Sequence, residues 1–156
     1  MRLDLTVNTL TNHAVNNRRI TVFGGDQKRP NIHIDDITDL YVELLHMPTD
    51  LIGGEVFTAG YENLRVSELA EQVKHAVERE YPELAPIPIV TTPSDDRRSH
   101  HVSSRKIAAK LGWKPRRSIE DAVRDVCCAL RDGRLPRSME DDRYFNVRTV
   151  KKFPLR

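Results

Sequence analysis

Apolar residues recur at three- and four-residue spacing in five stretches of the chain, which predicts five amphipathic helices. Start and stop signals bound most of these stretches, and the last predicted helix carries a Ser118/Asp121 capping box before it and Gly133 after it. The predicted helices cover residues 3–17, from Asp35 or Asp36 to Pro48, from Ser67 to Pro82, 103–111 and 119–132.

Short β-rich runs lie between these helices. The clearest is Ile20–Phe23, which runs into the Gly24-Gly25 turn. The other predicted strands are 32–34, 55–59, 87–90, an edge strand because of its prolines, and 99–102. Strands mixed with helices predict an α/β or α+β domain.

Composition limits the architecture to one ordinary soluble domain. The chain has 156 residues, of which 38% are hydrophobic and 31% charged. It has no apolar run near the length of a membrane span, and its N-terminus lacks the apolar region of a signal peptide. The only two cysteines, Cys127 and Cys128, are adjacent and poorly placed to bond to each other. We therefore expect a cytoplasmic protein with no membrane association.

Charge is nearly balanced overall but uneven along the chain. The formal net charge is +2, whereas residues 134–156 hold seven basic and three acidic residues and show no hydrophobic periodicity. We interpret 1–133 as the folded domain and 134–156, the C-terminal segment, as a solvated basic tail. A nucleic-acid-binding arm is a weaker alternative, because the segment has no aromatic stacking platform around a recognised module.

Several common catalytic motifs are absent. There is no glycine-rich GxGxxG or GxxGxxG turn, no GxxxxGK[ST] loop and no tyrosine followed four residues later by lysine. The Gly24-Gly25 and Gly53-Gly54 pairs are interpreted as ordinary turns. His100-His101 has no carboxylate or cysteine at ligand spacing, so no metal site is predicted.

An ordered set of motifs nevertheless points to a known family. They are RITVFGGDQKRPNIHIDDI at 19–37, FTAG at 57–60, RVSELA at 65–70 and SSRKIAAKLGWKP at 103–115. Across about residues 2–132, the chain resembles the C-terminal half of an extended short-chain dehydrogenase/reductase, the family of nucleotide-sugar epimerases and dehydratases. The resemblance implies an α+β substrate-binding lobe. The Rossmann half of that family, which holds NAD or NADP and the catalytic YxxxK pair, is mostly missing, so this chain alone is expected to bind no cofactor.

The resemblance also implies substrate-binding residues. Asn8 and Arg29 match positions that contact the diphosphate, and Arg98 matches an arginine that approaches the nucleotide from the other side, although the alignment can slip onto Arg97. Thr21 matches a strand beside the base. Asp96 matches a position at which a ribose contact and a simple ion pair are equally expected.

Simpler structural roles stand beside these assignments. Asn8 is equally well explained as a cap or a surface amide, and Thr21 as part of an ordinary buried strand. In the same stretch as Arg29, we interpret His33 as a packed strand residue and Asp36 as a helix cap. No catalytic residue is predicted in this chain.

These expectations give a main hypothesis and an alternative. The main one is the nucleotide-sugar-binding portion of an NAD(P)-dependent nucleotide-diphosphate-sugar epimerase or dehydratase, inactive alone, with the missing Rossmann half as partner. The alternative is a stand-alone, non-catalytic nucleotide-sugar-binding or regulatory module. Because a half-domain exposes an apolar surface, homo-oligomers are also expected.

Overall fold

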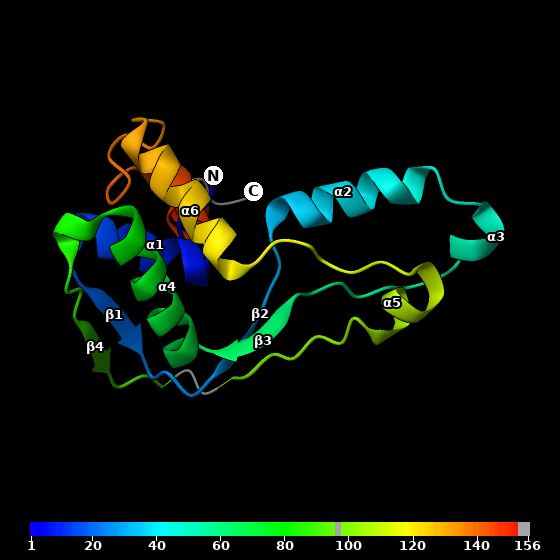
Figure 1. Cartoon of the computed structure of the whole chain (residues 1–156), viewed down its shortest axis with the longest axis horizontal. Helices are drawn as coiled ribbons and strands as arrows, with labels where there is room; N and C mark the ends of the chain where they lie inside the picture. The colour runs from blue at the N-terminus through cyan, green and yellow to red at the C-terminus, as the bar shows by residue number, and fades with distance from the viewer. Residues whose placement is uncertain (96–97, 153–156) are drawn as a thin grey trace.

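The computed structural model describes residues 1–95 and 98–152 and shows a mixed α/β chain that divides into a body and an arm (Figure 1). Within these residues, no helix has the length and apolar character needed to cross a membrane. The elements, in chain order, are α1 (Thr6–Asn17), β1 (Ile20–Phe23), β2 (Lys28–Asn31), α2 (Ile34–Leu45), α3 (Thr49–Ile52), β3 (Glu62–Arg65), α4 (Val66–Glu80), a 3-10 turn (Pro82–Leu84), β4 (Ile89–Thr92), α5 (Arg105–Leu111), α6 (Ile119–Arg131), a second 3-10 turn (Asp142–Tyr144) and α7 (Asn146–Lys152).

The body is built on helices α1, α4 and α6, which pack against one another beside a small parallel sheet of β1 and β4 (Figure 1). Its core contains Leu69, Val73 and Val77 from one face of α4 together with Val123 of α6, and all four are fully buried. Cys127 lies in the same core as a free thiol, and burial raises its pKa to about 12. The mixed fold predicted from the sequence is therefore confirmed.

All five predicted helices are present. Helix α6 begins with the expected capping box, in which the Ser118 hydroxyl accepts the Asp121 amide and the Asp121 carboxylate accepts the Ser118 amide. Helix α5 ends at Gly112, whose φ of 66° is in the left-handed region. Helix α1 starts three residues later than predicted, at Thr6. Local caps and one apolar face were thus sufficient to predict these helices.

Three predicted strands are wrong. The 32–34 strand is displaced to β2, because Ile34 already begins α2 and the antiparallel pairing with β3 uses Lys28–Asn31. The segment 55–59 has no strand partner among the described residues, and 99–102 is irregular. The predicted 87–90 strand is present as β4, two residues further along, where it pairs with β1.

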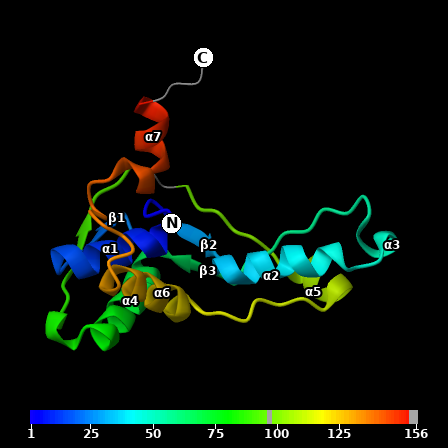
Figure 2. The same cartoon turned by 90° about the horizontal axis from the view of Figure 1, so that it is seen from above.

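The arm consists of residues 34–60 and 103–115 and extends away from the body (Figure 2). Its small core is centred on Leu40 of α2, Ile107 of α5 and Trp113, all of which are buried, and Phe57 and Ala59 pack against these side chains. The arm therefore holds together through its own apolar cluster, separate from the core of the body.

An ion-pair cluster attaches α5 to the segment that precedes Phe57. Lys106 Nζ lies 2.7 Å from Glu55 Oε2, and Lys110 Nζ lies 2.5 Å from Glu55 Oε1. Hydrogen bonds from Lys106 and then Lys110 lower the pKa of Glu55 from 4.5 to about 2. Because the pKa is lowered by folding, this interaction is complete above about pH 4.5 and is lost as the pH falls through 2.

We expect a carbon-detected NMR titration of the Glu55 side chain to give a midpoint near 2. The double variant Lys106→Met/Lys110→Met removes both cations and is expected to return the midpoint toward 4.5. A midpoint near 4.5 in the unmodified chain would show that the two lysines do not hold this carboxylate in solution.

The C-terminal segment is less solvated than predicted. Its charged side chains are mostly exposed, but Leu135, Ser138 and Tyr144 are buried. Tyr144 packs with Leu3 and Ala129, and its carbonyl accepts the Leu3 amide at 2.9 Å. The described part of this segment is therefore packed on the body up to the second 3-10 turn, while the boundary at 133 stays a prediction.

Candidate functional site

A largely apolar cleft of about 680 Å³ lies where the body meets the beginning of the arm. Three parts of the chain form its walls: the start of α1, the stretch from β2 into α2, and the start of α6. Its polar lining includes Asn8 and Arg29, which the sequence analysis assigned to a diphosphate and which are brought to the same cleft by the fold. The other polar or charged lining residues are Arg2, Thr6, Asn31, His33, Tyr61, Arg117, Ser118 and Asp125.

Asn8 lies in the first turn of α1, and its carboxamide donates a hydrogen bond of 2.7 Å to the Arg2 carbonyl. Leu5 precedes the helix and provides no side-chain cap, and the first turn contains no acidic residue. The first amides of the helix therefore lack an acceptor from a capping side chain, and their positive end lies at the cleft wall. This helix end suits an anion.

Arg29 lies on β2, opposite Leu64 of β3, and is half-buried. Its Nη1 donates to the Lys28 carbonyl at 3.0 Å and to the Arg98 carbonyl at 2.5 Å. These bonds hold the guanidinium against the strand, and Arg29 is among the residues that line the cleft. Arg29 thus supplies a positive charge to the same cleft that the start of α1 lines.

The other predicted site residues have different positions. Arg98 is exposed and meets Arg29 through its backbone carbonyl, and it does not line the cleft in the described part of the chain. Thr21 lies on β1, paired with Val90 of β4, and likewise is not part of the described lining. Asp96 falls outside the described residues. The substrate roles assigned to these three residues stay predictions.

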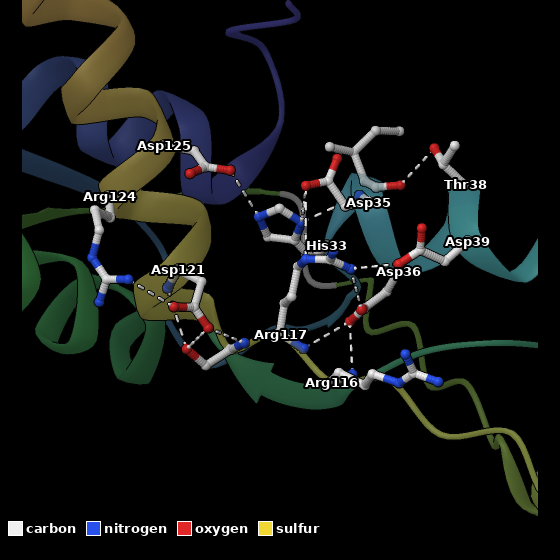
Figure 3. A network of polar contacts seen from close by, with 12 residues as sticks. His33, Asp35, Asp36, Thr38, Asp39, Arg116, Arg117, Asp121, Arg124 and Asp125 are labelled. Atoms are coloured by element: carbon white, nitrogen blue, oxygen red, sulfur yellow. Dashed lines mark hydrogen bonds and ion pairs between the residues drawn. The ribbon is translucent and has the colours of Figure 1, made fainter.

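His33 forms part of the wall between α6 and α2 (Figure 3). Its side chain is 3% exposed, Nδ1 accepts the Asp35 amide at 3.2 Å, and Nε2 lies 3.2 Å from Asp125 Oδ2. Because Nδ1 acts as an acceptor, a neutral ring carries its proton on Nε2 and donates it to Asp125. His33 therefore caps α2 and links it to α6, rather than packing in a strand as expected.

Asp36 does not cap α2, contrary to the interpretation from the sequence, because His33 occupies that position. The Asp36 side chain is 2% exposed and its Oδ2 accepts the backbone amides of Arg116 and Arg117, at 3.0 and 2.9 Å. Its Oδ1 binds Arg117 Nη1 at 2.9 Å, and Arg117 also binds Asp39 (Figure 3). The carboxylate thus anchors the chain that enters α6 at the cleft.

The sequence analysis missed Arg117 and the His33–Asp125 pair as parts of this wall. Arg117 immediately precedes the Ser118 capping box, which predicts a helix start but not a partner about 80 positions earlier in the chain. His33 was noted only as part of a motif. Neither contact could have been predicted without knowing that α2 and α6 meet in the fold.

Three side chains in this wall have groups that metal ions bind. Ligand atoms of His33, Asp35 and Asp125 lie within 4.8 Å of one another. Both ring nitrogens of His33 are already used, one by the Asp35 amide and one by the Asp125 carboxylate. This hydrogen-bond network accounts for the arrangement, and we assign no metal to it.

The Gly24-Gly25 turn does not have the geometry of a dinucleotide-binding turn. A dinucleotide turn leads from a strand directly into a helix, where the first amides meet the pyrophosphate. Gly24 and Gly25, with φ of 76° and 116°, instead lead from β1 into β2. In addition, the Gly25 carbonyl accepts a hydrogen bond from the Ser67 amide at the start of α4, which ties the turn to that helix. The pair is a turn, as the sequence indicated.

A second cavity of about 480 Å³ lies between the end of α1, the end of α6 and the C-terminal segment. Its lining includes Asn16, Tyr81 and Arg131 but none of the residues assigned to a ligand from the sequence. The Tyr81 hydroxyl donates to the Cys127 carbonyl, and Arg131 stacks on the Tyr81 ring. These contacts join α4 to α6, so we place the candidate site in the larger cleft.

Comparison with solved structures agrees with the expected fold, although no family model matches the sequence. A UDP-glucuronic acid 4-epimerase from Bacillus cereus, in complex with UDP-glucuronic acid and NAD, aligns with a TM-score of 0.68 at 20% identity, covering 85% of this chain and 41% of the epimerase. A dTDP-glucose 4,6-dehydratase from Bacillus anthracis, in complex with NAD, aligns with a TM-score of 0.64 at 16% identity, covering 86% of this chain and 42% of the dehydratase. An L-threonine dehydrogenase from Phytophthora infestans aligns with a TM-score of 0.64 at 12% identity, covering 81% of this chain and 41% of the dehydrogenase.

The chain spans about two fifths of the length of these structures. It therefore has the fold of part of an extended short-chain dehydrogenase/reductase, which confirms the resemblance seen in the motifs at the level of fold. The covered share agrees with the expectation of one half of such a protein. Since a threonine dehydrogenase shares this fold, the fold does not select the substrate.

Proposed function

We propose that this chain is the nucleotide-sugar-binding portion of an NAD(P)-dependent nucleotide-diphosphate-sugar epimerase or dehydratase. One observation carries the proposal: Asn8 at the uncapped start of α1 and Arg29 on β2 line the same cleft. A helix N-terminus and a guanidinium that share a cleft are complementary to a diphosphate. Two of the neighbouring structures in fold are a UDP-glucuronic acid epimerase and a dTDP-glucose dehydratase.

The chain's own residues would bind and orient the substrate. Arg29 and the first amides of α1 hold the diphosphate, and the apolar part of the lining, such as Ile119 and Val126, excludes water beside it. Asp36 keeps the start of α6 in place on the far wall. No catalytic acid or base is assigned to these residues.

NAD or NADP belongs to the part of the enzyme that this chain lacks. When bound there, the cofactor would transiently accept a hydride from the sugar. The turn at Gly24-Gly25 offers no pyrophosphate cradle, so we expect the isolated chain to bind neither cofactor and to be inactive alone. Its partner is then a Rossmann half carrying GxxGxxG and YxxxK, located either earlier in the same reading frame or in a second protein.

Replacing Arg29 with alanine is expected to weaken UDP-glucuronic acid binding by about 10- to 100-fold, the range for losing a charged hydrogen-bond donor. The measurement is an NMR titration of the intact chain into the millimolar range, because half of a cleft binds weakly. Arg134→Ala is the matched control, since Arg134 is exposed and pairs with Asp132 away from the cleft. Equal affinities for the Arg29→Ala variant and the unmodified chain would contradict the assignment.

The affinity of the isolated chain separates this proposal from the alternative of a stand-alone binding module. Micromolar binding of UDP-glucuronic acid or dTDP-glucose without a partner would favour the module. Millimolar binding, together with an upstream reading frame that encodes GxxGxxG and YxxxK, would favour the enzyme portion. Saturable binding of L-threonine without nucleotide-sugar binding would contradict both.

A further inference from the structure

The second cavity lies at the far ends of two helices that begin at the cleft. Helix α1 lines the cleft with Asn8 and the cavity with Asn16, and helix α6 lines the cleft with Ile119 and the cavity with Arg131. No described residue lines both hollows. The cavity volume of about 480 Å³ lies in the range of small-molecule sites. The cavity is therefore a separate hollow of sufficient size for a ligand.

One part of the cavity wall already has its polar groups paired. The Tyr81 hydroxyl donates to the Cys127 carbonyl at 2.9 Å. Arg131 Nη2 donates to the Glu80 carbonyl at 2.8 Å and to the Glu80 carboxylate at 3.2 Å. These groups hold α6 against the end of α4, so a ligand would have to break existing bonds to use them.

The turn 137–140 of the C-terminal segment contributes polar groups that lack such partners. Among the described residues, the Arg137 guanidinium makes no hydrogen bond, and its ion pair with Asp141 is 3.6 Å long. Ser138 is 4% exposed, and its hydroxyl accepts the Asn16 amide at 3.3 Å but donates to no acceptor in the described part of the chain. The Glu140 carboxylate likewise pairs with no described residue. This turn thus presents a cation, a hydroxyl donor and an anion to the cavity.

The backbone of this turn is strained. Arg137 has a φ of 51°, in the left-handed region that disfavours residues other than glycine. Arg18 shares this conformation, but there it ends α1, whereas Arg137 lies within a turn and accepts the amides of Glu140 and Asp141 at 2.9 and 3.0 Å. Backbone strain of this kind is concentrated at sites that bind ligands. A ligand-binding role would account for the strain at Arg137.

The rest of the lining is apolar. Leu135 is buried, and Val15 and Leu130 are half-buried beside it. A ligand that matches the whole lining has an apolar part, a negatively charged group for the guanidinium and hydroxyl, and a positively charged group for the carboxylate. A zwitterion with an apolar side chain has all three.

We propose that the second cavity binds a free α-amino acid with an apolar side chain. Arg137 and Ser138 donate to its carboxylate, and Glu140 accepts from its ammonium group. The apolar side chain of the ligand lies against Leu135 and its neighbours in the lining. This inference does not rest on the proposed function, because none of these residues is part of the described lining of the cleft.

The test is an NMR titration of the intact chain with L-leucine. Saturable shifts are expected at the amides of Leu135 and Ser138. Two analogues each remove one charged group: isocaproate lacks the ammonium group, and isoamylamine lacks the carboxylate. Each should bind at least about tenfold more weakly than L-leucine, because each loses a hydrogen bond between charged groups.

Arg137→Ala and Glu140→Gln test the two charged groups of the chain. Alanine carries the same Cβ as arginine, so Arg137→Ala adds no backbone strain at the left-handed φ. Both variants should weaken L-leucine binding at least about tenfold. Arg134→Ala is the matched control, because Arg134 is exposed three positions earlier, pairs with Asp132 and is absent from the described lining of the cavity. Its affinity for L-leucine should be unchanged.

Several results would overturn the proposal. They are no saturable shift through the millimolar range, equal affinities of Arg137→Ala and Arg134→Ala, or binding of either analogue as tightly as L-leucine. Shifts confined to Asn8 and its neighbours would overturn it as well, since they would place the amino acid in the cleft. Binding of UDP-glucuronic acid should be the same in Arg137→Ala and the unmodified chain, so failure of this site and failure of the proposed function are measured separately.

Discussion

Replacing Asp36 with alanine is expected to lower the free energy of unfolding by about 3 kcal/mol, the cost of removing one partner from a buried charged network. The side chain is 2% exposed, and its loss leaves the backbone amides of Arg116 and Arg117 without this acceptor and removes one of the two carboxylates that bind Arg117 Nη1. Urea denaturation monitored by circular dichroism measures the effect directly.

Asp39→Ala provides the control for this prediction. Asp39 accepts a hydrogen bond of the same length from Arg117, but its side chain is 48% exposed and accepts no backbone amide from any residue that the structure describes. An exposed ion pair contributes at most about 1 kcal/mol, so Asp39→Ala should cost far less than Asp36→Ala. Equal losses would show that the Arg117 ion pair, rather than the backbone contacts of Asp36, stabilises this wall.

The position of Asp36 also connects stability to the cleft. Arg117 and Ser118 line the cleft, and the Asp36 carboxylate sets where that stretch enters α6. We therefore expect ligand affinity to fall in Asp36→Ala even under conditions in which the variant is fully folded. Asp36 is in this sense a positioning residue, with no ligand contact of its own.

Local sequence information accounts for the elements that carry their own signals. Helices α4 and α6 have an apolar face and start signals within a few residues, so their existence could be predicted without knowledge of the fold. Strand β2 has the sequence Lys-Arg-Pro-Asn, which shows no β pattern, and it forms because β3 lies opposite. The segment 55–59 shows the reverse case, since a β pattern without a partner gives no strand.

The candidate site was predictable only in part for the same reason. Asn8 and Arg29 were identified through family motifs, and the fold places both at one cleft. The Asp36 contacts with Arg116 and Arg117 join positions about 80 residues apart, and no local pattern encodes such a pairing. Family motifs therefore indicated two residues in the lining of the candidate cleft, whereas the network that holds its wall in place required the three-dimensional structure.

The C-terminal segment offers the second large expected effect. Replacing Tyr144 with alanine should lower the free energy of unfolding by about 3 kcal/mol, as for other buried aromatic side chains. Tyr144 is 8% exposed and packs with Leu3 and Ala129, and with them it forms a core cluster apart from that of α1, α4 and β1. A solvated tail, as its basic composition suggested, would make the same substitution nearly neutral.

Two further variants test whether the loss of stability in Tyr144→Ala comes from the loss of ring packing. Tyr144→Phe keeps the ring, and within the described residues the hydroxyl takes part in no hydrogen bond, so its cost should stay within about 0.5 kcal/mol. Val147→Ala alters an exposed side chain three positions later in the same segment and should be equally mild. Thermal unfolding of the three variants measures their stability. A large loss of stability confined to Tyr144→Ala would establish that residues up to the second 3-10 turn belong to the folded domain, because only a packed ring leaves a cavity when it is removed.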